Sequence, residues 1–78
     1  MTTSEAQQIA EDAVRDLPGL IPVPRAAELL GVTPRTLRRW ASVGRIVVLK
    51  TARGRGARAL VPRESLRRFL VDLAERSA

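Results

Sequence analysis

Apolar residues near the start of the chain recur at helical spacing and predict a first helix. The stripe comprises Ala6, Ile9, Ala13 and Leu17. Thr3 or Ser4 can cap the N-terminus of this helix, with Gln7 at capping-box spacing from Ser4, and Pro18-Gly19 stops it. Large side chains are few in this stripe. We therefore expect the helix to dock on the core or on another copy of the chain.

Two further helical segments follow, joined by a short turn. The run Leu20–Val23 leads to a helix predicted over Pro24–Leu30, because proline suits the first helical position, where its missing N–H costs nothing. Ala27 and Leu30 share one face of this helix, and Gly31 ends it.

The next helix is predicted from Pro34 to about Val43, with Thr33 as its cap, Val32 pointing inward and Gly44 closing it. Its inner face comprises Leu37, Trp40 and Ala41. Two short helices joined by a turn with a glycine form a helix-turn-helix.

The pattern then changes to that of strands. Arg45–Lys50 is rich in β-branched residues and predicts a strand, and Arg58–Val61 predicts a second. The loop Thr51–Ala57 between them is long for a hairpin, so we expect its tip to protrude. Pro62 is predicted to open a last helix. The apolar stripe of that helix comprises Leu66, Phe69, Leu70 and Leu73.

A helix-turn-helix followed by a β-hairpin is a winged helix-turn-helix. The predicted fold class is therefore mainly α with a small β-hairpin, a winged helix-turn-helix with an additional N-terminal helix. We divide the chain into an acidic N-terminal helix or arm over residues 1–20 and a DNA-binding domain over residues 21–78.

Charge is distributed unevenly along the chain. The net charge of the 78 residues is +6, and residues 1–22 are acidic, with a net charge of −3. Residues 33–63 hold nine Lys and Arg and no acid. Because a solvated surface normally mixes both signs, this segment indicates a polyanionic partner.

The composition excludes most catalytic chemistry. The chain contains no His, Cys or Tyr, which removes hydrolytic triads, thiol chemistry and zinc sites of the His/Cys type. We expect no enzyme, no catalytic residue, no metal, no cofactor and no small-molecule ligand. The first 20 residues lack the features of a secretion signal and no apolar run spans a membrane, so we expect a cytoplasmic protein without a membrane partner.

One stretch resembles a known family. The run VPRAAELLGVTPRTLRRW over Val23–Trp40, followed by Gly44 and by ALVPRE over Ala59–Glu64, resembles the excisionase and MerR-like winged helix superfamily. It is most similar to the small excisionases, or recombination directionality factors, of phages and integrative elements. The resemblance covers residues 21–72. Two features depart from it: the first wing strand lacks the proline that many members have, and the acidic N-terminal helix lies outside it.

The resemblance implies a sequence-specific DNA-binding protein of a bacterial host cell. It would bind repeated sites on double-stranded DNA cooperatively, next to other copies of itself, bend the DNA and direct an integrase toward excision. Smooth bending of a short site costs about 1–6 kcal/mol, which favours several copies acting together. A small transcriptional regulator is the alternative. An RNA-binding or protein-interaction module is disfavoured by the scarcity of aromatic residues.

In this fold the second helix of the helix-turn-helix enters the major groove. The candidate DNA-binding residues there are Thr33, Arg35, Thr36, Arg38, Arg39 and Ser42. We assign Arg35 and Arg38 to base edges and Arg39 to a phosphate, with phosphate contacts for all three as the alternative. Arg25 either contacts phosphate or faces solvent.

The loop between the strands is interpreted as a wing tip for a minor groove. The candidate residues are Lys50, Arg53, Gly54, Arg55 and Arg58, the first and last of them at the DNA backbone. A flexible loop with a general phosphate preference is the alternative. Gly54, Gly56 and Ala59 formally fit a dinucleotide-binding pattern, but the helix that this pattern requires does not follow. Trp40 is interpreted as core.

The last helix carries basic residues for which we expect ion pairs rather than DNA contacts. Arg63, Arg67 and Arg68 lie on this predicted helix, and we expect them to pair with Glu64 or Asp72.

Overall fold

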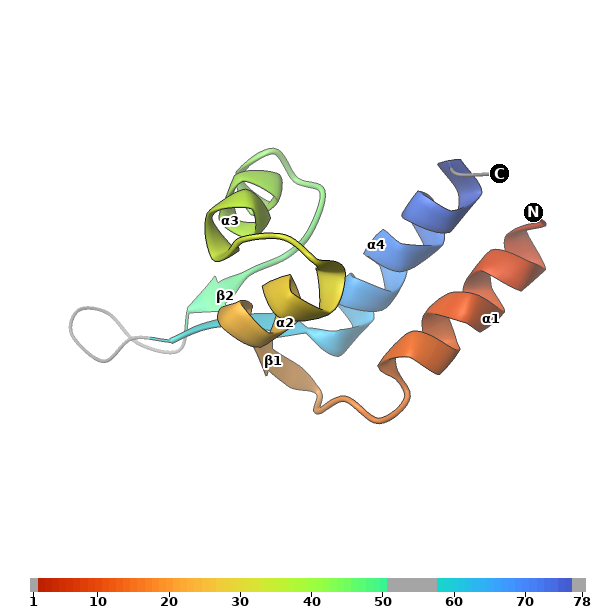
Figure 1. Ribbon diagram of the computed structural model, residues 1–78, viewed down its shortest axis with the longest axis horizontal. Coiled ribbons are helices and arrows are strands. Elements are labelled where there is room, and N and C mark those ends of the chain that lie inside the picture. Colours follow the sequence, from red (N-terminus) through yellow and green to blue (C-terminus); the bar gives the residue numbers. More distant parts are fainter. Residues whose placement is uncertain (1, 51–57, 77–78) are drawn as a thin grey trace.

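The computed structural model of the chain describes residues 2–50 and 58–76 (Figure 1). In chain order the elements are α1 (Thr3–Val14), β1 (Leu20–Pro22), α2 (Val23–Leu30), α3 (Pro34–Ser42), β2 (Leu49–Lys50), β3 (Ala59–Pro62) and α4 (Arg63–Arg76). The structure is mainly helical, with a small antiparallel sheet. This confirms the predicted winged helix-turn-helix with an additional N-terminal helix.

The sheet has a strand that the sequence pattern did not predict. Its order is β1-β3-β2, and β1 pairs antiparallel with β3 in the register Leu20↔Pro62. We expected Leu20–Val23 only as a run leading into a helix, and the expectation of a two-stranded hairpin was incomplete. The strand has three residues and its partner lies about 40 positions further along the chain, so no local period marks it.

The predicted strand over Arg45–Lys50 is shorter than expected. Only Leu49 and Lys50 pair with β3. Ile46 enters the core, and the backbone N–H of Val47 donates to Ser65 Oγ of α4 at 2.8 Å instead of to a sheet partner. The first part of the predicted strand is therefore a connection fastened to α4.

The ends of β3 and α4 also differ slightly from the prediction. β3 runs over Ala59–Pro62, one residue later than expected, and Pro62 closes this strand instead of opening the last helix. Leu73 is 44% exposed, so the expected apolar stripe of α4 is buried only as far as Leu70, which is half-buried.

α1 docks along α4, as Figure 1 shows, which confirms that this helix packs on the rest of the chain. Its cap is Thr2 and not Thr3 or Ser4, because Thr2 Oγ1 accepts a hydrogen bond from the backbone N–H of Glu5 at 3.1 Å. The predicted face was only partly right, because Ala6 is buried and Leu17 is half-buried against the core, whereas Ala13 is exposed. The buried residues are Ala6, Ala10 and Val14, and Ile9 stays 49% exposed. Small side chains let the two helices approach closely, so the face rich in alanine is the buried one.

The helix-turn-helix follows the prediction, except that α2 begins at Val23, one residue earlier than expected. Gly31 ends α2 with φ +70°, and Gly44 follows α3 with φ +79°, both in the left-handed region that glycine adopts without strain. Thr33 caps α3 by accepting from the backbone N–H of Thr36 at 3.2 Å. Leu37 is fully buried and fixes α3 on the core. The cluster of buried residues around it comprises Val14, Ile21, Val23, Ala26, Ile46, Val61, Leu66 and Phe69.

Within residues 2–50 and 58–76, no helix is both long enough and apolar enough to cross a membrane.

Candidate nucleic-acid interface

α3 presents three arginines to solvent. Arg35, Arg38 and Arg39 are all exposed, while Leu37 between them is fully buried. A helix turns about 100° per residue, so Arg35 and Arg39 lie on the side opposite Leu37. Arg38 lies only about a quarter turn from Leu37, on a flank of the helix. The three arginines therefore face two directions.

The hydroxyl groups predicted to bind DNA hold the ends of α3. Thr33 Oγ1 and Thr36 Oγ1 lie 3.0 Å apart at its N-terminus, and Ser42 Oγ donates to the backbone oxygen of Arg39 at 2.7 Å. Thr33 and Ser42 are exposed, and Thr36 is half-buried. These contacts make α3 a fixed platform for its arginines.

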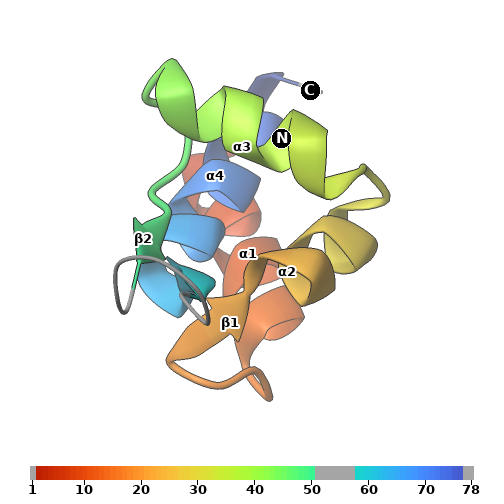
Figure 2. The ribbon, with the colours of Figure 1, turned by 90° about the vertical axis from the view of Figure 1, so that its left-hand side faces the viewer.

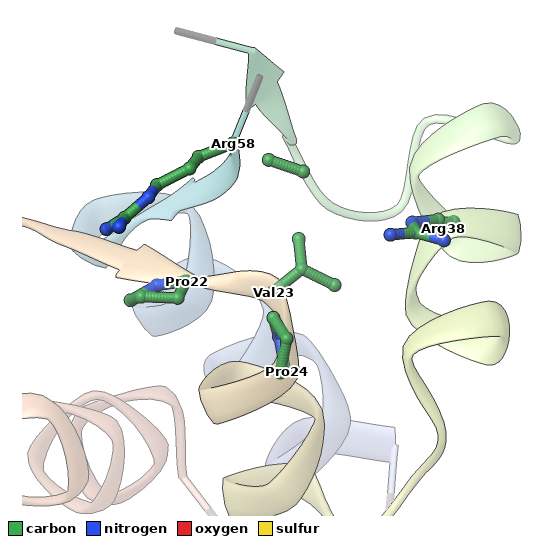
Figure 3. Close-up of a pocket in the computed structure, with 6 residues that line it drawn as sticks. Pro22, Val23, Pro24, Arg38 and Arg58 are labelled. Atoms are coloured by element: carbon green, nitrogen blue, oxygen red, sulfur yellow. The ribbon is translucent and has the colours of Figure 1, made fainter. Parts of the chain in front are cut away.

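Beside α3 lies a cleft that the sequence pattern did not predict. It has a volume of about 310 Å³. The cleft is lined by Pro22, Val23, Pro24, Arg38, Arg58 and Ala59. Figure 3 shows Arg38 reaching it from α3 on one side and Arg58 from the start of β3 on the other, with Val23 between them. No local signal could have revealed this cleft, because its wall depends on the pairing of β1 with β3.

The wing strands, β2 and β3, stand at the same end of the molecule as α3. Figure 2 looks onto this end and shows α3 crossing above β2 and β1, with α1 and α4 behind. Lys50 and Arg58 are exposed at the described ends of the wing. The predicted tip residues Arg53, Gly54 and Arg55 lie outside the described residues.

Ion pairs in the described part of the chain lie on α2 and on the α1 and α4 helices. They join Asp12 to Arg15, Arg25 to Glu28, Glu64 to Arg67 and Arg68, and Asp72 to Arg76. Within residues 2–50 and 58–76 these pairs leave the three arginines of α3 without an acidic partner. Arg25, the possible phosphate contact, is exposed, with its Nη1 3.9 Å from Glu28 Oε1.

Of the three α4 arginines for which we predicted ion pairs, two form them. Arg67 donates to Glu64 through Nε at 2.9 Å and also through Nη2, and these hydrogen bonds lower the pKa of Glu64. Arg68 also pairs with Glu64. Arg63 instead donates to the backbone oxygen of Leu17, so its predicted ion pair was wrong. It fastens the connection after α1 to the start of α4.

Arg45 was absent from the predicted site. Its guanidinium carbon lies 5.8 Å from the ring centre of Trp40 and 5.9 Å from that of Phe69, and the two rings are stacked with centroids 5.0 Å apart. Trp40 is half-buried against the core, as its position on the inner face of α3 predicted. Arg45 thus adds a cation–π contact to the junction between α3 and α4.

The comparisons with known proteins agree with this geometry. The family model of a helix-turn-helix domain matches residues 23–71, which span α2, α3, the wing strands and most of α4. The chain belongs to this helix-turn-helix family. The family includes excisionase-like DNA-binding proteins. Comparison with curated proteins and with solved structures finds no match.

Membership in the helix-turn-helix family implies sequence-specific DNA binding. The helix-turn-helix places α3 as the recognition helix, with Leu37 inward and Arg35 and Arg39 outward. The end formed by α3 and the wing strands is therefore the candidate interface (Figure 2).

Proposed function

We propose that this helix-turn-helix protein is an excisionase, which binds repeated DNA sites cooperatively, bends the DNA and directs an integrase toward excision. The resemblance of residues 21–72 to the small excisionases supports this proposal. The observation that carries the DNA-binding part is the set of arginines on α3, which lack acidic partners in the described structure and lie beside the wing strands.

In this proposal α3 lies in the major groove. Arg35, on the side of α3 opposite the core, can bind O6 and N7 of one guanine together, which gives about 1–3 kcal/mol of discrimination. Arg39 binds a phosphate from the same side. The wing, with Arg53 and Arg55 near its tip, enters the adjacent minor groove.

The protein works by arranging DNA, and the integrase supplies the recombination chemistry. Bending a short site costs about 1–6 kcal/mol, which several copies can share. α1 and α4 stand at the end of the molecule away from the wing strands (Figure 1). In this proposal one of these helices meets a neighbouring copy, which leaves α3 uncovered.

The decisive experiment uses the DNA beside the gene, with an integrase present or absent. Footprinting and a gel-shift series are expected to show several copies binding together, with slower migration of fragments bent at their centre. Excision by the integrase is expected to depend on the protein. Single, independent binding without curvature would contradict the cooperative part. Normal excision without the protein, together with changed transcription of a nearby gene, would support the regulator instead.

The salt dependence gives a second test. If about six basic residues neutralise phosphates, log affinity falls with log salt with a slope near −5. Arg35→Ala is expected to relax base preference at one position, and Arg53→Ala to weaken binding most at A/T-rich flanks. Arg15→Ala, at the C-terminal cap of α1, is the control and is expected to leave affinity unchanged. If Arg35→Ala and Arg53→Ala lose the same affinity for every DNA sequence, both arginines contact only phosphates.

A further inference from the structure

The cleft between α3 and the wing strands is lined by both charged and apolar side chains. Arg38 stands on the α3 side and Arg58 on the β3 side, and Val23, Pro24 and Ala59 provide apolar surface between them. Figure 3 shows the Arg58 side chain running above Pro22 and away from Arg38, so the two cations stand on opposite sides of the cleft instead of converging on one point. This lining favours a ligand with two anionic groups and a less polar part between them.

We propose that one sugar–phosphate strand of duplex DNA lies in this cleft, with one phosphate at Arg38, another at Arg58 and the strand between them over Pro24 and Ala59. The inference rests on the proposed function, since it requires α3 and the wing to bind adjacent grooves of one duplex. A single backbone strand separates two adjacent grooves, so that strand must cross the space between α3 and the wing strands. The cleft occupies that space.

The start of α2 adds to the attraction for phosphate. α2 begins at Val23 with Pro22 at its cap, and no side chain caps this end of the helix. Pro22, Val23 and Pro24 all line the cleft, so the positive end of the α2 dipole lies beside it. Two guanidinium groups on separate elements and this helix end thus act on the same strand.

This inference changes the role of Arg38. The sequence assigned Arg38 to a base edge, together with Arg35. In the structure Arg38 lies on the flank of α3 and lines the cleft, whereas Arg35 and Arg39 lie on the side opposite Leu37. A side chain held at the backbone positions the protein on the duplex and carries no sequence information.

The salt dependence of binding separates the two roles. Arg38→Ala and Arg58→Ala are each expected to reduce the magnitude of the log–log slope by about 0.9, with the same proportional loss of affinity on a selected site and on a pool of random duplexes. Arg35→Ala is the matched control on the same helix. Its loss of binding affinity is expected to be larger for the selected site than for the random pool. Thermal melts of each variant show that it is folded.

A second variant changes the apolar lining of the cleft and keeps both arginines. Pro24→Asp places a carboxylate in the cleft, and Asp is favourable in the first turn of a helix, so α2 is retained. Binding to every duplex is expected to fall by about tenfold or more at low salt, because like charges then face each other. Ser4→Asp adds the same charge to the first turn of α1, outside the cleft, and is expected to leave affinity unchanged.

The outcomes distinguish this inference from the proposed function. If the unaltered protein fails to bind duplex DNA, the proposed function fails. If it binds, but Arg38→Ala keeps the full salt slope and loses base preference at one position, Arg38 contacts a base and the cleft inference is wrong. Unchanged binding by Pro24→Asp would likewise overturn it.

Discussion

Alanine at Gly31 and at Gly44 is expected to destabilise the helix-turn-helix through the backbone alone. Both glycines have positive φ, +70° and +79°, while an added Cβ would meet no atom within 4 Å at either position. An L side chain in the left-handed region costs about 1–2 kcal/mol. For a domain of this size each 1 kcal/mol lowers Tm by about 4–8 °C, so each variant is expected to melt roughly 4–16 °C below the unaltered protein.

Gly19 supplies the matched control. It also has open space around a Cβ, but its φ is not positive, so alanine there adds no strain. Gly19→Ala is expected to raise stability by about 0.4–1 kcal/mol, because alanine restricts the unfolded chain more than glycine does. Gly44→Asn is expected to lose less stability than Gly44→Ala, since asparagine adopts the left-handed region more readily than alanine does.

The assay is thermal unfolding followed by far-ultraviolet circular dichroism, repeated in urea so that the midpoint and its slope are both measured. The expected order of stability is Gly19→Ala, the unaltered protein, then Gly31→Ala and Gly44→Ala. A loss of the same size at Gly19 as at Gly31, or unchanged stability at both Gly31 and Gly44, would refute the backbone argument.

Three further substitutions test the core, the surface and the α3–α4 junction. Leu37→Ala is expected to lower the free energy of unfolding in urea by about 2–5 kcal/mol, because Leu37 is fully buried. An unchanged urea midpoint would contradict its place in the core. Glu64→Gln is expected to lower stability slightly at neutral pH. The Arg67 hydrogen bonds depress the pKa of Glu64 in the folded chain, so this stabilisation is present above the unfolded pKa and is lost as the pH falls through the folded one; a stability difference that grows on acidification would contradict this sign. Arg45→Ala is expected to cost about 0.5–1 kcal/mol and to alter the fluorescence of Trp40, and an unchanged spectrum would argue against the cation–π contact.

The helix-turn-helix could be predicted from sequence because its signals are local. Thr33, Pro34 and Gly44 mark the ends of α3 through backbone chemistry that depends on near neighbours, and the structure bears these ends out. Leu37 was predicted to face inward from the helical period, and it is fully buried. The exposure of the α3 arginines follows from the same period.

The errors concern contacts between distant parts of the chain. β1 exists because Leu20–Pro22 pairs with β3, and the predicted strand over Arg45–Lys50 is shortened because Val47 bonds to Ser65 of α4. The buried face of α1 follows its fit against α4, which favours small Ala10 over large Ile9. Periodicity within one segment carries no information about such partners. The cleft beside Arg38 was missed for the same reason.

The packing of α1 along α4 has a consequence for how the chain reaches its native state. Roughly 50 residues separate the end of α1 from the start of α4, so this contact closes a loop containing the helix-turn-helix and both wing strands. Long-range closure slows folding relative to a bundle stabilised by neighbouring helices. We expect α2 and α3 to form early and the α1–α4 pair to close late, so that mutations in α1 mainly accelerate unfolding.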